Sequence, residues 1–148
     1  MPFRFSLQAV LRWRESFERR ERLRLEVVTR EWVKAQQQRE QAKLDRTYAA
    51  LEFQKKLRQG INVAEMQFEL ACDRTRARRI AMWNERIAKL ADLRRRQIEV
   101  FRKAQQQRKI VEKLRDRQLA AYRLVQDRRA QQQLDERFLM AHGRENVP

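Results

Sequence analysis

The feature that most constrains this chain is the stretch 74–140, which contains neither glycine nor proline. Its apolar residues are spaced alternately three and four apart, beginning with Ile80, Trp83 and Ile87. Nine of the fourteen positions on this ladder between residues 80 and 125 are apolar. The polar ones are Arg94, Gln97, Arg108, Arg115 and Gln118. This spacing is typical of a coiled-coil seam, and a helix with such a seam needs a partner to bury it.

The first sixty residues supply that partner. On the same kind of ladder between Leu25 and Phe53, seven of nine positions are apolar, and the two polar ones are Arg39 and Arg46. Three of the apolar positions are alanines, which favour a close approach of the two helices. Gly60 then provides a residue that readily adopts the left-handed conformation found just past a helix C-terminus. These signals predict a helix over residues 7–59.

The segment 60–73 is interpreted as the turn of a hairpin. Asn62 followed by Glu65 resembles a capping pair, which predicts a short linking helix, and Asp73 is placed to cap the next helix. We therefore predict an all-α fold in which two long helices, 7–59 and 74–140, form an antiparallel coiled-coil hairpin with a short linking helix. The tail 141–148 is expected to be flexible, and residues 1–148 are expected to form a single domain.

The register of the hairpin follows from where its turn is placed. The expected pairs are Phe53 with Ile80, Leu25 with Arg108, and Leu11 with Tyr122. The second helix then extends beyond the first at the far end. Its apolar residues there, Leu134, Phe138 and Leu139, would have no partner within the chain, and an exposed apolar overhang is a candidate docking surface.

The charge of the chain predicts an acidic partner. There are 36 Lys+Arg against 20 Asp+Glu, a net charge of +16, which favours an acidic protein, a nucleic acid or an anionic lipid surface. The single cysteine, Cys72, excludes an internal disulfide and fits a reducing compartment. Because no apolar run approaches the roughly 20 residues needed to span a bilayer and no signal-peptide core is present, we expect a cytoplasmic protein.

No set of residues predicts catalysis. The single histidine, His142, has no placed nucleophile, one Cys and one His cannot form a structural zinc site, and no glycine-rich phosphate loop is present. We therefore expect no enzyme activity, no cofactor, no metal and no small-molecule substrate. Basic clusters at 19–24, 74–79 and 94–96 leave a nucleic-acid-binding coiled coil as an alternative, although acidic residues interrupt them. A purely structural coiled-coil dimer is a further alternative.

Two end motifs resemble a known family. Residues 3–15 read FRFSLQAVLRWRE, and residues 110–138 read IVEKLRDRQLAAYRLVQDRRAQQQLDERF. The second segment contains a basic Lys113-Leu114-Arg115 stretch, a central Tyr122, and Leu134-Asp135-Glu136 near its end. In this order, and with two long helices between them, these motifs resemble the flagellar export protein FliJ family. The related stalk proteins of injectisomes share the architecture and remain an alternative.

The resemblance implies a function as a part of the flagellar type III protein export apparatus, at the cytoplasmic face of the inner membrane. It implies an antiparallel coiled coil, similar to the central stalk of rotary ATPases, that docks in the hexameric ring of the export ATPase and promotes its assembly and activity. It also implies contact with the cytoplasmic domain of the export gate and with export chaperones.

The resemblance and the position along the hairpin together predict two sets of contact residues. The expected ATPase contacts are at the joint end of the two helices: Phe5, Leu7, Trp13, Phe17, Leu134, Asp135, Glu136 and Phe138. The expected export-gate contacts are Gln41 and Tyr48, which are seven residues apart on one face of the first helix.

Overall fold

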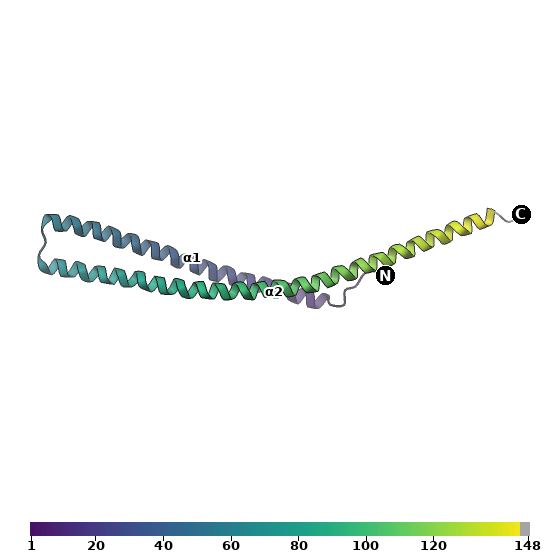
Figure 1. Ribbon diagram of the computed structural model, residues 1–148, viewed down its shortest axis with the longest axis horizontal. Helices are drawn as coiled ribbons and strands as arrows, with labels where there is room; N and C mark the ends of the chain where they lie inside the picture. Colours follow the sequence, from purple (N-terminus) through teal and green to yellow (C-terminus); the bar gives the residue numbers. More distant parts are fainter. Residues whose placement is uncertain (146–148) are drawn as a thin grey trace. The chain divides into compact units, whose positions relative to one another are not determined.

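The computed structural model describes residues 1–145, and in this part of the chain all regular structure is helical. Helix α1 spans Gln8–Gln59 and helix α2 spans Val63–Glu145. The two helices are joined by a short connection and run antiparallel (Figure 1). The predicted all-α hairpin is therefore confirmed.

Three residues make the turn. Gly60 has a φ of 91°, in the left-handed region that glycine adopts without a steric penalty, and its N–H donates to the Leu57 carbonyl at 3.3 Å. Asn62 then caps α2, because its side-chain oxygen accepts from the Glu65 N–H at 2.8 Å. Both signals for this turn were present in the sequence, and each performs the expected local role.

The separate linking helix is not seen, because α2 begins directly at Val63 and continues through the segment that was assigned to the turn. Asp73 consequently lies inside α2 and does not cap a helix. Residues 141–145, which were assigned to the tail, form the last turn of α2. Residues 146–148 of that tail lie outside the described part of the chain.

The early start of α2 changes the register by about eleven residues from the predicted one. Phe53 lies with Glu69 and Leu70 along one groove and is not near Ile80. The expected partner of Leu25, Arg108, instead forms an ion pair with Glu18. The expected partner of Leu11, Tyr122, contacts Phe3. Because residues 63–73 belong to α2, they pair with the last turns of α1 and shift every later pair by the same amount.

The seam itself is where the sequence placed it. The most buried apolar residues all lie on the two predicted ladders or their continuation, apart from Phe5, and include Leu11, Ala35, Ala42, Leu90 and Ala104. The alanines lie opposite larger side chains, since the observed contacts bring Ala35 level with Ile87. Alternation of small and large residues lets two helices approach closely without leaving a void.

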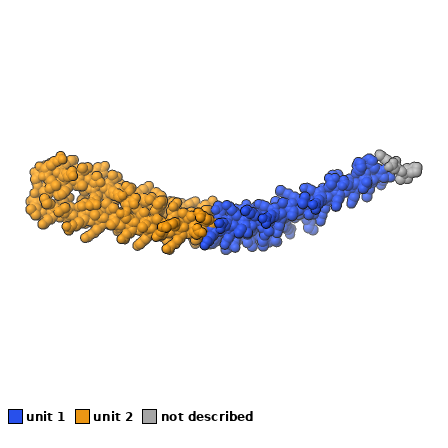
Figure 2. All heavy atoms as spheres, in the orientation of Figure 1, with its two compact units in different colours: residues 1–18, 103–148 blue, residues 19–102 orange. Residues whose placement is uncertain are grey.

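The described residues divide into two compact units, 1–18 with 103–145 (unit 1) and 19–102 (unit 2), coloured separately in Figure 2. Polar seam residues find partners within each unit. In unit 1, Glu18 binds Arg108, which also pairs with Glu112.

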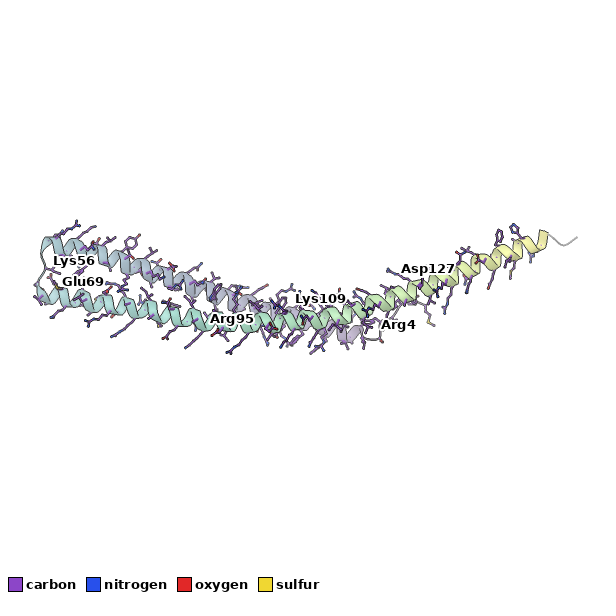
Figure 3. The ribbon with its side chains drawn as sticks, viewed as in Figure 1. Arg4, Lys56, Glu69, Arg95, Lys109 and Asp127 are labelled. Atoms are coloured by element: carbon purple, nitrogen blue, oxygen red, sulfur yellow. The ribbon has the colours of Figure 1, made fainter. Side chains whose placement is uncertain are left out.

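In unit 2, several polar residues pair from one helix to the other, Arg39 with Asn84 and Arg94 with Thr29 among them. The buried Glu21 accepts from Gln97 at 2.6 Å, Arg46 binds Asp73 at 2.9 Å, and Lys56 binds Glu69 at 3.2 Å on facing sides of the helices (Figure 3). A polar residue in a coiled-coil seam is satisfied in one register and unpaired in others. We infer that these pairs specify the register of α1 on α2.

Candidate partner-docking surfaces

The first residues of unit 1 lie along α2 in a non-helical conformation. The Phe3 and Tyr122 ring centroids are 5.5 Å apart, and the Tyr122 hydroxyl donates to the Met1 carbonyl. Phe5 is only 7% exposed. This segment therefore extends the cover of the α2 seam beyond the point where α1 begins, and Phe5 contributes to packing inside unit 1.

An exposed aromatic pair lies near the start of α1. The rings of Trp13 and Phe17 stack with centroids 5.6 Å apart, and Trp13 is 55% exposed. The Arg14 guanidinium lies 4.8 Å from the centre of the Trp13 ring and also donates to the Gln107 side chain of α2. Because Arg14 contacts both Trp13 and α2, the aromatic pair is held in place while its outer surface stays open to solvent.

After Gln126, α2 has no neighbour within unit 1, and every side chain from 127 to 144 is exposed (Figures 1 and 3). We call residues 127–144 the free segment. Its large exposed apolar residues are Leu134, Phe138, Leu139 and Met140. The Phe138 and His142 rings lie 4.0 Å apart, and Gln131 donates to Asp135 at 3.0 Å. The overhang predicted from the sequence is therefore present, and its apolar residues have no partner within the described chain.

The predicted ATPase contacts do not form one surface. Leu7, Trp13 and the half-buried Phe17 belong to α1 or its start, whereas Phe5 is buried. Leu134, Asp135, Glu136 and Phe138 lie in the free segment, all exposed. Leu134 is twelve residues beyond Tyr122, or about 18 Å along the helix axis. Unit 1 therefore presents two separate exposed groups, one on α1 and one on the free segment.

The two predicted gate contacts do share an exposed face of α1 in unit 2. Tyr48 is 63% exposed, and Gln41, also exposed, donates to Asp45 at 3.0 Å. Sequence reasoning missed Leu44 and Leu51, which are about half exposed and lie four residues before and three after Tyr48. Apolar residues at helical spacing but off the seam ladder are the signal that could have identified them.

The helices leave hollows near the turn that the sequence did not predict. One, of about 660 Å³, is lined by residues of both helix ends, including Lys56, Ile61 and Phe68. Another, of about 420 Å³, lies beside Ala49, Ala50 and Phe53 and is bounded by the Arg46–Asp73 pair. Consecutive alanines leave space beside the seam, and this end of unit 2 is correspondingly open.

The contact between Arg46 and Asp73 perturbs the ionisation of both residues. Arg46 donates two hydrogen bonds to the Asp73 carboxylate, at 2.9 and 3.1 Å. These bonds lower the pKa of Asp73 below its ordinary value, and the nearby positive charge of Arg46 and Arg76 acts in the same direction. The same contact raises the pKa of Arg46. The pair lies at the surface and fits a role in pairing the helices.

The described residues show neither a metal site nor a membrane span. Among the described residues, no group of three or more His, Cys, Asp or Glu side chains is placed to hold a metal ion. Neither helix, over those residues, has a segment that is both long and apolar enough to cross a bilayer.

The comparison with known families decides the identity. Residues 3–147, nearly the whole chain, match the family described as Flagellar FliJ protein. The chain belongs to the FliJ family. It is accordingly a component of the flagellar protein export apparatus, as its two end motifs indicated. No curated protein and no solved structure matches the chain.

Proposed function

We propose that this FliJ-family chain is a non-enzymatic stalk that docks in the ring of the flagellar export ATPase and promotes the assembly and activity of that ring. The observation that carries the proposal is the free segment of α2. A helix that exposes Leu134, Phe138, Leu139 and Met140 with no partner of its own buries them only by contacting another molecule. Such a segment is suited to insertion into the centre of a ring.

The second exposed group of unit 1 supports the same proposal. Trp13 and Phe17 present a rigid aromatic surface, and aromatic side chains are enriched among residues that dominate binding energy at protein interfaces. Leu7 and Val10 add exposed apolar area on the same helix or at its start. We propose that the free segment enters the ring first and that this group contacts the ring at a second level.

The pattern of basic residues favours this function over nucleic-acid binding. In the cluster 94–96, Arg95 pairs with Asp92, and Arg94 bonds to Thr29 while lying over the Trp32 ring. In the cluster 19–24, Arg24 pairs with the buried Glu21. Several of these arginines already bind groups of the chain itself, which leaves fewer of them to contact a phosphate backbone.

ATP hydrolysis and ring assembly by the cognate export ATPase test the proposal. We expect the wild-type chain to raise both, and we expect the Leu134→Asp/Phe138→Asp variant to abolish the effect, because charge is placed where apolar surface must be buried. Met82→Asp is the matched control, since Met82 is 58% exposed but lies in unit 2. Equal stimulation by all three proteins would refute docking through the free segment.

We further propose that the outer face of α1 around Gln41 and Tyr48 contacts the cytoplasmic domain of the export gate. Its support is the exposed group of Leu44, Tyr48 and Leu51, on the face turned away from α2. Affinity of the chain for the purified gate domain is the measurement. Tyr48→Ala/Leu51→Ala should weaken binding at least about tenfold if these are central contacts, whereas the Phe138→Asp variant should bind as wild type does.

The remaining parts of the proposed function follow from family membership. We propose binding to export chaperones and a location at the cytoplasmic face of the inner membrane, held there through the export apparatus. We also propose that the chain acts without enzymatic activity, cofactor or small-molecule substrate. Co-purification with export chaperones, compared between the wild-type chain and the Leu134→Asp/Phe138→Asp variant, would test the proposed chaperone binding.

A further inference from the structure

The free segment differs from the rest of α2 in how its charges are arranged. In the middle of α2, acidic residues are followed three residues later by their partners, as in Asp92–Arg95 and Glu99–Arg102. The free segment contains a basic pair, Arg128–Arg129, which follows Asp127, and an acidic pair, Asp135–Glu136, which precedes Arg137. None of these four residues has an opposite charge three or four positions away, and none forms an ion pair with another residue of 1–144.

The two pairs are one heptad apart. Arg128 and Asp135, and likewise Arg129 and Glu136, are separated by seven residues and therefore lie on one side of the helix. A second helix with the same sequence, running antiparallel, would place its acidic pair against this basic pair and its basic pair against this acidic pair. A parallel second copy would place like charges together.

We propose that the free segment forms an antiparallel, two-fold symmetric helix pair with the free segment of a second copy of this chain. The interface is isologous, so each complementary contact occurs twice and four inter-chain ion pairs form. The two-fold axis passes near the run Gln131–Gln133, whose amides can pair with one another across it. This run of glutamines had no role in the seam of the hairpin.

The same arrangement also matches apolar residues. It brings Leu124 of one chain level with the stretch Phe138–Met140 of the other, and Leu124 is 53% exposed in the single chain. This contact occurs twice in the symmetric pair, once on each side of the ion pairs and the central glutamines. Helices paired over residues 121–142 would be in contact along about 33 Å, long enough for three heptads.

The pairing would cover Phe138 and the acidic pair, which are also proposed to contact the ATPase ring. A chain paired with its copy would therefore be unable to dock, and pairing and docking would exclude each other. The inference itself needs no ATPase, because it rests on the charges and exposure of the free segment. It can be tested on the purified full-length chain alone.

Sedimentation of the full-length chain at about 0.1 M salt tests the pairing. We expect a monomer–dimer equilibrium, and we expect Arg128→Glu/Arg129→Glu and Asp135→Arg/Glu136→Arg each to weaken it at least about tenfold, since every inter-chain ion pair becomes a repulsion. An equimolar mixture of the two variants should associate again through complementary charges. Arg78→Glu/Arg79→Glu, a charge change of the same size in unit 2, should leave the equilibrium unchanged.

Disulfide trapping in a Cys72→Ser background tests whether the two helices of the pair run antiparallel. Gln131→Cys lies near the axis and should form a covalent dimer on mild oxidation. Leu124→Cys should not, because antiparallel pairing separates the two copies of residue 124 by about 24 Å along the helix axis. A wild-type chain that stays monomeric at all accessible concentrations, or trapping at 124 in preference to 131, would overturn the proposal.

Discussion

At the scale of single residues, the most informative feature is the buried carboxylate of Glu21. It is 2% exposed and accepts hydrogen bonds from Arg24 at 2.9 Å and from Gln97 at 2.6 Å. Gln97 also donates to the Glu21 backbone carbonyl. An apolar residue would fill this seam position as well, but it would not distinguish one register from another. We interpret Glu21 as a residue that exchanges some stability for specificity.

The first prediction concerns this residue. Glu21→Ala should lower the free energy of unfolding by about 1–3 kcal/mol, because it leaves a cavity and removes the acceptor of the Arg24 and Gln97 hydrogen bonds. Glu21→Leu/Gln97→Leu should be close to wild type in stability, since both polar partners are removed together. Urea denaturation measures both. If Glu21→Ala left the free energy of unfolding unchanged, the Glu21 side chain would contribute nothing to the stability of the folded state.

The second prediction concerns the pH dependence of the Arg46–Asp73 pair. The pKa of Asp73 is lowered by its hydrogen bonds to Arg46, so the pair stabilises the fold above the ordinary pKa of 3.8. That contribution is lost as the pH falls through the lowered folded-state pKa. The difference in stability between wild type and Asp73→Asn should therefore be present at neutral pH and vanish in acid. An equal difference at both pH values would contradict the assignment.

At the scale of elements, the turn depends on one backbone conformation. Gly60→Ala should destabilise the hairpin by about 1 kcal/mol, because alanine is strained at a φ of 91° even though the space around it is open. Gly143→Ala is the matched control, since Gly143 is helical and also meets no neighbouring atoms. It should keep or raise the helix content. Thermal unfolding followed by circular dichroism checks both, and equal effects would refute this account of the turn.

The elements also show what sequence could and could not predict. Seam positions were predictable because heptad spacing depends only on the local helical repeat, and Gly60 and Asn62 have specific conformational preferences. The register was not, because it depends on where α2 begins. Aspartate is a common helix N-cap, so the sequence suggested that role for Asp73. Its role as the partner of Arg46 is evident only in the folded hairpin. Likewise, Phe5 was predicted as an ATPase contact, but its side chain is buried within unit 1.

At the scale of the whole molecule, the two helices of one chain form a hairpin (Figure 1). Spin labels at positions 35 and 87, both in unit 2, should report close approach within one chain, since packed helices lie about 8–10 Å apart between axes. Dilution with unlabelled chain should not alter this distance. Labels at 35 and 98, which the sequence-based register would pair, should be about 16 Å farther apart along the helix axis. The opposite order of the two distances would contradict the register described above.

Photo-crosslinking to the export ATPase tests whether the chain docks through its free segment. A photoreactive residue at position 138 should give a crosslink to the ATPase subunit in the assembled ring, and one at position 82 should not. Adding excess unlabelled wild-type chain should remove the crosslink. Efficient crosslinking from position 82, with none from 138, would contradict docking through the free segment.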